Sequence, residues 1–327
     1  MRAAWYDGQG PASEVLRVGE LPDPEPGGGE VRVRIHLSGI NPGDTKKRRG
    51  FFGSAMPFPR VVPHSDGAGV IDRVGPGGDP ERIGRRVWVF GAQSYRAFGT
   101  AAEYTVVPND LAVDLPDTVD DASGACLGIP GVTAHRCVFT DGPVSGATVL
   151  VQGVLGGVGR IAAALGTWGG ATVIGTVRRT DDLQRIPGGL VHHAVALDAG
   201  DPVAAIRAAA PGGVDRIVEV ALAANADLDD AVLADNGVIA AYATDDARTT
   251  IPFWTLLFHN VTIRLCGSDD FPLEAKLQAA ADLTSVAAAG SLAIPTAPPY
   301  PLADIAAAHD AVDAGARAGR VLIDVTR

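Results

Sequence analysis

The chain of 327 residues is long enough for about two domains, and its 46% hydrophobic and 20% charged residues are ordinary for a globular protein. A net charge of −11 argues against a nucleic-acid partner, because surfaces that bind nucleic acid are basic. No apolar run reaches the roughly 18 residues that cross a bilayer, and residues 1–10 hold no apolar signal sequence. The three cysteines, Cys126, Cys137 and Cys266, lie far apart, which indicates free, buried thiols. We therefore expect a cytoplasmic protein without a membrane or nucleic-acid partner.

Up to about residue 120, the chain alternates short strand-like runs with segments rich in glycine and proline. The runs are "EVRVRIHLSG" (30–39), "GAGVIDRVG" (67–75), "RRVWVFG" (85–91) and "AAEYTVVP" (101–108). This pattern predicts a small, mostly antiparallel, barrel-like domain with long loops.

From residue 148 onward, short apolar strands alternate with helical segments. Strands are expected at 148–153, 171–177, 192–198, 214–220 and 237–243, with helices such as 159–169, 202–211 and 225–235 between them. Such alternation is typical of a doubly wound parallel sheet, so the fold class is α/β. A helix at 272–289 and a strand at 320–325 follow, and they are too short to fold alone. We expect residues 1–120 with 268–327 to form one domain and residues 121–267 the other.

The run "VQGVLGGVGR" (151–160) lies between a predicted strand and a predicted helix. Gly153, Gly156 and Gly159 recur at three-residue spacing, and Gly157 is added to them. Glycines at such a turn allow positive φ and a close backbone approach to a pyrophosphate, with N–H groups at the helix start facing the phosphates. The first glycine is displaced from the strict G-x-G-x-x-G pattern, and a plain turn is the alternative. With the strands and helices around it, the run predicts a nucleotide site that includes Gly156, Gly157 and Val158.

The end of the next strand indicates which nucleotide is bound. NAD sites place an acidic residue there, about 20 residues after the glycines, to bind the ribose 2′-hydroxyl. This chain instead has "TVRRT", with Arg178 and Arg179 and no carboxylate. Guanidinium groups pair well with a 2′-phosphate, so the sequence favours NADPH over NADH. The alternative is that both arginines are simply solvated.

Several blocks of the chain, in this order, resemble one protein family. They are "MRAAWYDGQGPASEVLRVGELPDPEPGGGEVRVRIHLSGINPGD", "PHSDGAGVIDRVG", "GACLGIPGVTAHRCVF", the glycine turn, "VDRIVEVALAANADLD" and "AGRVLIDV". Together they resemble the zinc-independent quinone reductases of the medium-chain dehydrogenase/reductase superfamily, specifically the zeta-crystallin-like NADPH:quinone oxidoreductases. The resemblance implies a GroES-like domain followed by a Rossmann domain.

The resemblance also implies a site without metal. Zinc-dependent members place a cysteine where this chain has Asn41 and a histidine where it has Ser65, while His64 stands at a usual glycine position. The family places the asparagine near the nicotinamide ribose and the substrate, so Asn41 is expected to be catalytic, together with Asp44. Asp44 would brace its loop by hydrogen bonds or serve only as a turn residue. The cofactor contacts implied by the resemblance are Thr133, Ala243, Leu265, Gly267 and Arg320.

Candidate substrate contacts lie in two loops. A tyrosine common in the family is replaced by Lys46, and the segment 49–60, with Phe51, Phe52, Met56 and Phe58, is a candidate lid. Phe52, Lys46 and Tyr95 are expected to line the substrate site, because aromatic side chains can wall a flat ring. Packing into a core or an interface explains the aromatic residues equally well.

The resemblance implies transfer of hydride, or of single electrons, from NADPH to a quinone. Reduction of the activated C=C bond of an enal or enone, a non-catalytic crystallin-like role, and tailoring of an aromatic natural product remain alternatives. The small-molecule partner is thus a quinone or an enone. Relatives are usually dimers that pair their sheets edge to edge, so a homodimer is expected.

Overall fold

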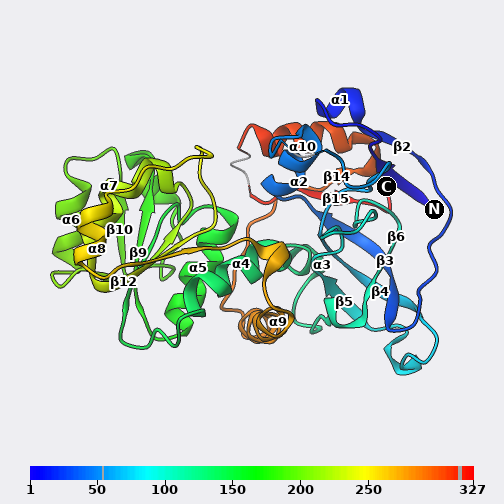
Figure 1. Cartoon of the computed structure of the whole chain (residues 1–327). Coiled ribbons are helices and arrows are strands. Elements are labelled where there is room, and N and C mark those ends of the chain that lie inside the picture. The colour runs from blue at the N-terminus through cyan, green and yellow to red at the C-terminus, as the bar shows by residue number, and fades with distance from the viewer. Residues whose placement is uncertain (54, 316–318) are drawn as a thin grey trace. The chain divides into compact units, whose positions relative to one another are not determined.

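The computed structural model describes residues 1–53, 55–315 and 319–327. The chain divides into two compact units (Figure 1). The first consists of Met1–Pro130 and Ala280–Arg327, and the second of Gly131–Ala279.

The described residues of the first unit form a seven-stranded sheet and a separate two-stranded one. The large sheet has the order β14-β15-β3-β4-β5-β7, and β6 also pairs with β3. All its pairs are antiparallel except β14 with β15. The strands are β1 (Arg2–Trp5), β2 (Arg17–Glu20), β3 (Glu30–Gly39), β4 (Asp66–Val74), β5 (Arg86–Val89), β6 (Tyr104–Pro108), β7 (Ala112–Asp114), β14 (Tyr300–Pro301) and β15 (Leu322–Asp324). The helices are α1 (Ala12–Val15), α2 (Pro42–Arg49), α3 (Asp121–Gly124) and α10 (Ile305–Asp313).

The second unit, Gly131–Ala279, is described throughout and contains a six-stranded parallel sheet. Its order is β10-β9-β8-β11-β12-β13, so the direction in which strands are added reverses beside β8. The strands are β8 (Thr148–Val151), β9 (Thr172–Val177), β10 (His193–Ala196), β11 (Val214–Glu219), β12 (Leu233–Ala241) and β13 (Thr262–Leu265). Helices α5 (Gly157–Trp168), α6 (Pro202–Ala209), α7 (Leu222–Val232) and α8 (Phe253–Phe258) pack around it (Figure 1). Helices α4 (Gly128–Phe139) and α9 (Leu273–Ala288) carry the chain across the unit boundaries.

One row of apolar side chains crosses the parallel sheet and explains why these segments form strands. Ile174, Leu150, Ile217 and Ile239 are register partners on four neighbouring strands, and all are buried. Burying a large aliphatic side chain contributes about 1.5–3 kcal/mol, so strands with this row on one face are held in one register. The mostly antiparallel unit and the doubly wound parallel unit expected from the sequence are both confirmed.

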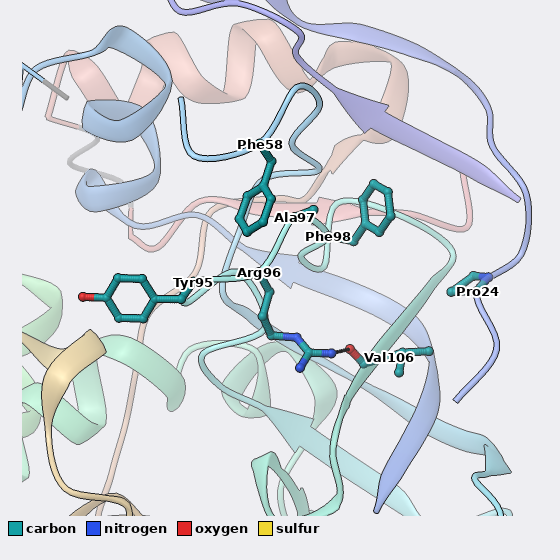
Figure 2. Close-up of a pocket in the computed structure, with 7 residues that line it drawn as sticks. All are labelled: Pro24, Phe58, Tyr95, Arg96, Ala97, Phe98 and Val106. Atoms are coloured by element: carbon teal, nitrogen blue, oxygen red, sulfur yellow. Dashed lines mark hydrogen bonds between the residues drawn. The ribbon is translucent and has the colours of Figure 1, made fainter. Parts of the chain in front are cut away.

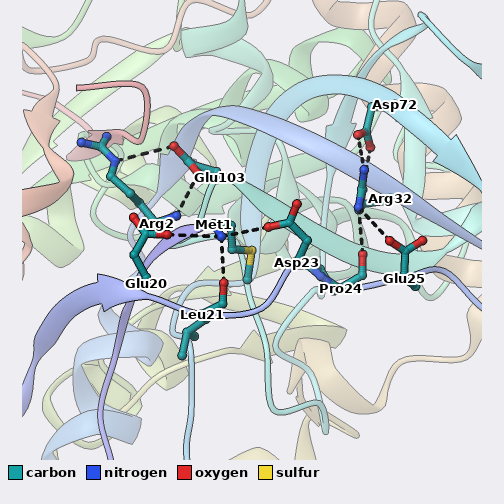
Figure 3. Close-up of polar contacts among 10 residues, drawn as sticks. All are labelled: Met1, Arg2, Glu20, Leu21, Asp23, Pro24, Glu25, Arg32, Asp72 and Glu103. Carbon is teal, nitrogen blue, oxygen red and sulfur yellow. Dashed lines mark hydrogen bonds and ion pairs between the residues drawn. The ribbon is translucent and has the colours of Figure 1, made fainter.

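Polar contacts fasten the N-terminal strand and the loop after β2 (Figure 3). The Met1 ammonium donates to the Leu21 carbonyl at 2.7 Å and to Asp23 at 2.8 Å. The buried Arg32 guanidinium binds Asp72 at 2.7 Å and the Pro24 carbonyl at 3.1 Å. The loop that carries Pro24 is therefore tied to the sheet.

All three cysteines are free and buried, as the sequence predicted. In the described part of the chain, none of the helices has both the length and the apolar character needed to span a bilayer.

Candidate cofactor site and candidate active site

The glycine turn follows β8, the strand beside which the sheet reverses its order. This is the position at which open α/β sheets bind nucleotides. Gly153 has a φ of +68°, which suits glycine, and α5 begins at Gly157 without a side-chain cap at Gly156. The N–H groups of the first helical residues, Gly157, Val158 and Gly159, therefore have no partner within the helix. The uncapped helix start expected after the glycines is thus present, and the binding of a pyrophosphate there stays a prediction.

Gly159 permits the helix to start directly against the turn. A Cβ atom at this position would lie 2.4 Å from the Gly153 carbonyl oxygen and 3.1 Å from the Val154 Cα. Real carbon atoms do not approach so closely, so any side chain would push α5 away from β8.

Polar groups below the turn were not identified from the sequence. The Gly153 N–H donates to the Thr176 hydroxyl at 3.1 Å, and this hydroxyl donates to the Gln152 side-chain oxygen at 2.6 Å. Gln152 in turn donates to Asp229 at 3.1 Å. Burial raises the pKa of Asp229 and of the neighbouring Glu219, and the charge of Glu219 raises that of Asp229 further. The turn therefore rests on a buried network that joins three strands and α7.

The paired arginines lie immediately after β9. Arg178 and Arg179 are both exposed, and neither makes a hydrogen bond or ion pair with the described residues. Thr180 follows them and donates through its N–H and its hydroxyl to Asp198, each at 2.8 Å. The acid at the end of β10 is thus engaged with Thr180, and both guanidinium groups remain open to a ligand.

In the first unit, Asn41 is held from both ends of its amide. It follows β3, is 4% exposed, and donates from Nδ2 to Asp66 Oδ2 at 2.6 Å. Its Oδ1 accepts from Arg320 Nη2 at 2.7 Å. Because each amide end meets the group of complementary hydrogen-bonding character, the orientation of the Asn41 side chain is fixed.

Asp66 is fully buried at the start of β4. Its second oxygen accepts from the Ile129 N–H at 2.8 Å. Gly128 makes this approach possible, since a Cβ atom there would lie 2.1 Å from that oxygen. Burial raises the pKa of Asp66 to about 7, against the lowering effects of the hydrogen bonds from Asn41 and Ile129. The site thus contains a carboxyl group that titrates near neutrality.

Asp44 braces the same loop. Its carboxylate accepts from the Asn41 N–H at 2.7 Å and lies in the first turn of α2. This is the loop-bracing contact expected from the sequence, and it orients the backbone of Asn41. A direct role of Asp44 in the reaction stays a prediction.

Ser65 lies where zinc-dependent enzymes have a histidine, and His64 directly precedes it. His64 has a φ of +75°, which explains why glycine is usual at this position. Its two ring nitrogens contact Ser38 Oγ at 2.8 Å and His309 Nε2 at 2.9 Å. Burial lowers the pKa of both imidazoles, that of His309 to about 3. Both nitrogens of His64 are engaged, and the described residues contain no cluster of three metal-binding side chains.

The candidate lid divides into exposed and packed residues, with residue 54 outside the described residues. Phe51 and Phe52 are 55% and 60% exposed, and the Lys46 ammonium lies 5.0 Å from the Phe51 ring centre. Met56 and Phe58 instead pack against the core of the first unit. Of the lid side chains, Phe51 and Phe52 are therefore open to a substrate.

A pocket of about 240 Å³ lies next to Phe58 (Figure 2). Its lining residues are Pro24, Phe58, Tyr95, Arg96, Ala97, Phe98 and Val106. The Arg96 guanidinium is occupied by the Val106 carbonyl at 3.0 Å and by Glu30 at 2.9 Å. Tyr95 is 70% exposed, and its ring points away from the other aromatic rings of the pocket.

The other expected cofactor residues are distributed over the second unit. Thr133 is 5% exposed on α4, and Leu265 is 76% exposed at the end of β13. The Ala243 carbonyl accepts from the Leu222 N–H at 3.3 Å, and Gly267 precedes a short 3₁₀ helix. Their contact with nicotinamide stays a prediction.

Comparison with known proteins agrees with this architecture. Residues 27–117 match the family described as "Alcohol dehydrogenase GroES-like domain". A quinone oxidoreductase of Rattus norvegicus is 36% identical over 165 residues, which are 50% of this chain and 49% of the rat protein. The chain thus spans about half the length of the curated relatives it matches. The structure of a mycobacterial quinone oxidoreductase has a TM-score of 0.85 at 26% identity and covers 99% of both chains.

The chain is thus similar to quinone oxidoreductases over about half of its length in sequence and over almost its whole length in fold. A mycobacterial protein complexed with NADPH is another structural neighbour, with a TM-score of 0.82, 26% identity and 99% coverage of both chains. The first unit contains the GroES-like domain, and the second is the Rossmann-like domain. Both units therefore have the folds found in these neighbours.

Replacing Gly159 tests the close approach of α5 to the turn. We expect Gly159→Ala to lower the free energy of unfolding by about 1–3 kcal/mol and to weaken nucleotide binding, because its Cβ meets backbone atoms. Gly188→Ala is the control, since a Cβ there has no neighbour within 4 Å. Urea unfolding and NADPH fluorescence titration measure both effects. Equal behaviour of the two variants would contradict the packing argument.

The raised pKa of Asp66 predicts a pH dependence of stability. The unfolded chain loses this proton near its ordinary value of 3.8, while the folded chain keeps it to about 7. Between these values the folded state binds more protons, so its stability falls as pH rises, by up to about 1.4 kcal/mol per pH unit.

Between pH 4 and pH 7, the stability of Asp66→Asn should lack the fall with rising pH that Asp66 causes. The exposed control Asp245→Asn should retain this fall. The measured quantity is the slope of stability against pH. A slope identical in wild type and Asp66→Asn would show that Asp66 is ionised throughout.

Proposed function

We propose that this protein is an NADPH-dependent quinone reductase that works without a metal ion. The observation that carries the proposal is the glycine turn at the sheet reversal, followed after β9 by two open guanidinium groups and no carboxylate. The relatives named as quinone oxidoreductases and the neighbour solved with NADPH support it. The proposal includes the division of roles expected from the sequence, with residues 121–267 holding the cofactor and the remainder contributing the substrate site.

The residues of the chain have positioning roles in this proposal. When bound, NADPH supplies a hydride, which a quinone accepts to become a hydroquinone anion that solvent can protonate. The N–H groups of Gly157 and Val158 would hold the pyrophosphate, and Arg178 and Arg179 the 2′-phosphate. Asn41, fixed between Asp66 and Arg320, would present its amide to the nicotinamide ribose and the acceptor. Thr133, Ala243, Leu265 and Gly267 are proposed to complete the nicotinamide side.

A quinone also suits the side chains at the candidate substrate site. Its reduction needs no Lewis acid and no general acid in a fixed position, whereas an enal or enone must receive a proton at carbon. Lys46 stacks on Phe51, and the Tyr95 ring is directed away from the aromatic pocket. Phe52 and the other exposed lid ring would provide a flat apolar surface for a planar acceptor.

We also propose that the protein is a homodimer, in keeping with the family. Strand β13 is one of the two edge strands of the parallel sheet. Next to it in the chain, α8 exposes Phe253, Trp254 and Phe258 at 56%, 67% and 78%. Such an apolar surface marks an interaction site, and a second copy would cover it. Sedimentation velocity tests this expectation.

Cofactor preference is the first test of the proposed function. We expect Arg178→Ala with Arg179→Ala to raise the KM for NADPH at least tenfold, about 1.4 kcal/mol, while the KM for NADH changes little. Arg248→Ala, an exposed arginine of the same unit, is the control. An unchanged preference for NADPH in the double variant would overturn the assignment of the 2′-phosphate site.

The acceptor is the second test. We expect turnover of 9,10-phenanthrenequinone to exceed that of a 2-alkenal, and Asn41→Ala to lower turnover while NADPH affinity stays within about tenfold. A preference for the alkenal would favour a reductase of activated C=C bonds. Tight NADPH binding without oxidation across a quinone panel would favour a non-catalytic role, and a fully active Asn41→Ala would remove Asn41 from the site.

A further inference from the structure

One buried arginine, Arg160, differs from the others because it has no partner among the described residues. Four arginines in the described residues are at least nine-tenths buried. Three of them bind an acid and a backbone carbonyl: Arg32 with Asp72 and Pro24 (Figure 3), Arg48 with Asp313 and Gly10, and Arg216 with Asp141 and Cys137. Arg160 is 8% exposed and has no hydrogen bond or ion pair with any described residue. A buried cation without a partner is costly, so this arginine requires an explanation.

Arg160 lies in the first turn of α5, directly after the glycines. Its N–H donates to the Gly156 carbonyl at 2.9 Å, and the fully described first turn contains no acidic residue. Its side-chain nitrogens are not sealed from solvent, unlike the unpaired Nε atoms of Arg48 and Arg320. Arg160 is therefore largely buried, while its guanidinium nitrogens keep some access to solvent.

The charged group that acts on Arg160 is another cation. Burial and the charge of Arg185 both lower the pKa of Arg160. Arg185 ends the 3₁₀ helix Thr180–Arg185 that follows β9, and it is itself paired with Asp182 at 2.6 Å. The glycine turn itself is hydrogen-bonded to β9, since the Val154 N–H donates to the Thr176 carbonyl at 2.9 Å. The first turn of α5, which carries Arg160, therefore starts beside the end of β9, from which Arg178 and Arg179 emerge. An anion at this position would relieve the unpaired charge.

We propose that Arg160 binds the 2′-phosphate of NADPH from the α5 side, as a third guanidinium beside Arg178 and Arg179. This inference rests on the proposed nicotinamide site and adds a residue that determines cofactor preference. A phosphate monoester carries close to two negative charges, which matches several guanidinium groups better than the singly charged phosphates of the pyrophosphate. The pyrophosphate is served by the N–H groups of Gly157, Val158 and Gly159.

The inference predicts opposite effects on stability and on binding. Without NADPH, Arg160 is a largely buried cation with no partner among the described residues, so its removal should not destabilise the free protein. With NADPH, its removal should weaken binding. A purely structural arginine would behave in the opposite way, because its loss would leave its partners unpaired.

The test compares Arg160→Met with Arg216→Met, which removes a buried arginine that is paired. For Arg160→Met we expect a melting temperature of the free protein equal to or above that of wild type, a Kd for NADPH raised at least tenfold, and a Kd for NADH within threefold. For Arg216→Met we expect a lower melting temperature, and small changes of similar size in the Kd values for NADPH and NADH. Arg160→Lys, which keeps the charge but not the planar fork, should lose less affinity for NADPH than Arg160→Met.

Four outcomes would overturn the inference. A fall in melting temperature of Arg160→Met to that of Arg216→Met, with an unchanged NADPH/NADH ratio, would assign a structural role. Equal weakening of both nucleotides would place Arg160 at the pyrophosphate. If the wild-type protein binds neither nucleotide, the proposed function fails as well. If the wild-type protein binds NADPH and Arg160→Met binds it with the same Kd, only this inference fails.

Discussion

The missing side chain at position 159 is the constraint on which the second unit depends. Because Gly159 has no Cβ, α5 begins against the carbonyl of Gly153, and its first N–H groups stand at the reversal point of the parallel sheet. The hydroxyl of Thr176 and the buried network below it then hold the turn from the other side.

The two candidate sites balance charge in different ways. In the first unit, the amide of Asn41 lies between Asp66 and Arg320, so opposite charges and an amide satisfy one another without a ligand. In the second unit, Arg160 and Arg178 have no partner in the described chain. The first arrangement gives a rigid group with a fixed orientation. The second leaves positive charge uncompensated. This charge lowers the stability of the free protein and strengthens the binding of an anion.

The sequence was sufficient for features that depend on neighbouring residues. The apolar run before the glycines, the two arginines after β9 and the alternation of strands and helices predicted the fold, the turn and the open guanidinium groups. It was not sufficient for the contacts of Asp66, because Asn41, Asp66 and Arg320 come from distant segments that meet only in the folded sheet. The burial of Arg160 is likewise a tertiary property, since in sequence it is only a good helix former. Gly128, which admits Asp66, could have suggested a close approach there.

The most direct test of the account is a crystal structure of the protein with NADPH. We predict the pyrophosphate at the N–H groups of Gly157 and Val158, the 2′-phosphate within hydrogen-bond distance of Arg160, Arg178 and Arg179, and Asn41 beside the nicotinamide ribose. A cofactor bound away from the glycine turn, or a 2′-phosphate that contacts none of the three arginines, would contradict the account.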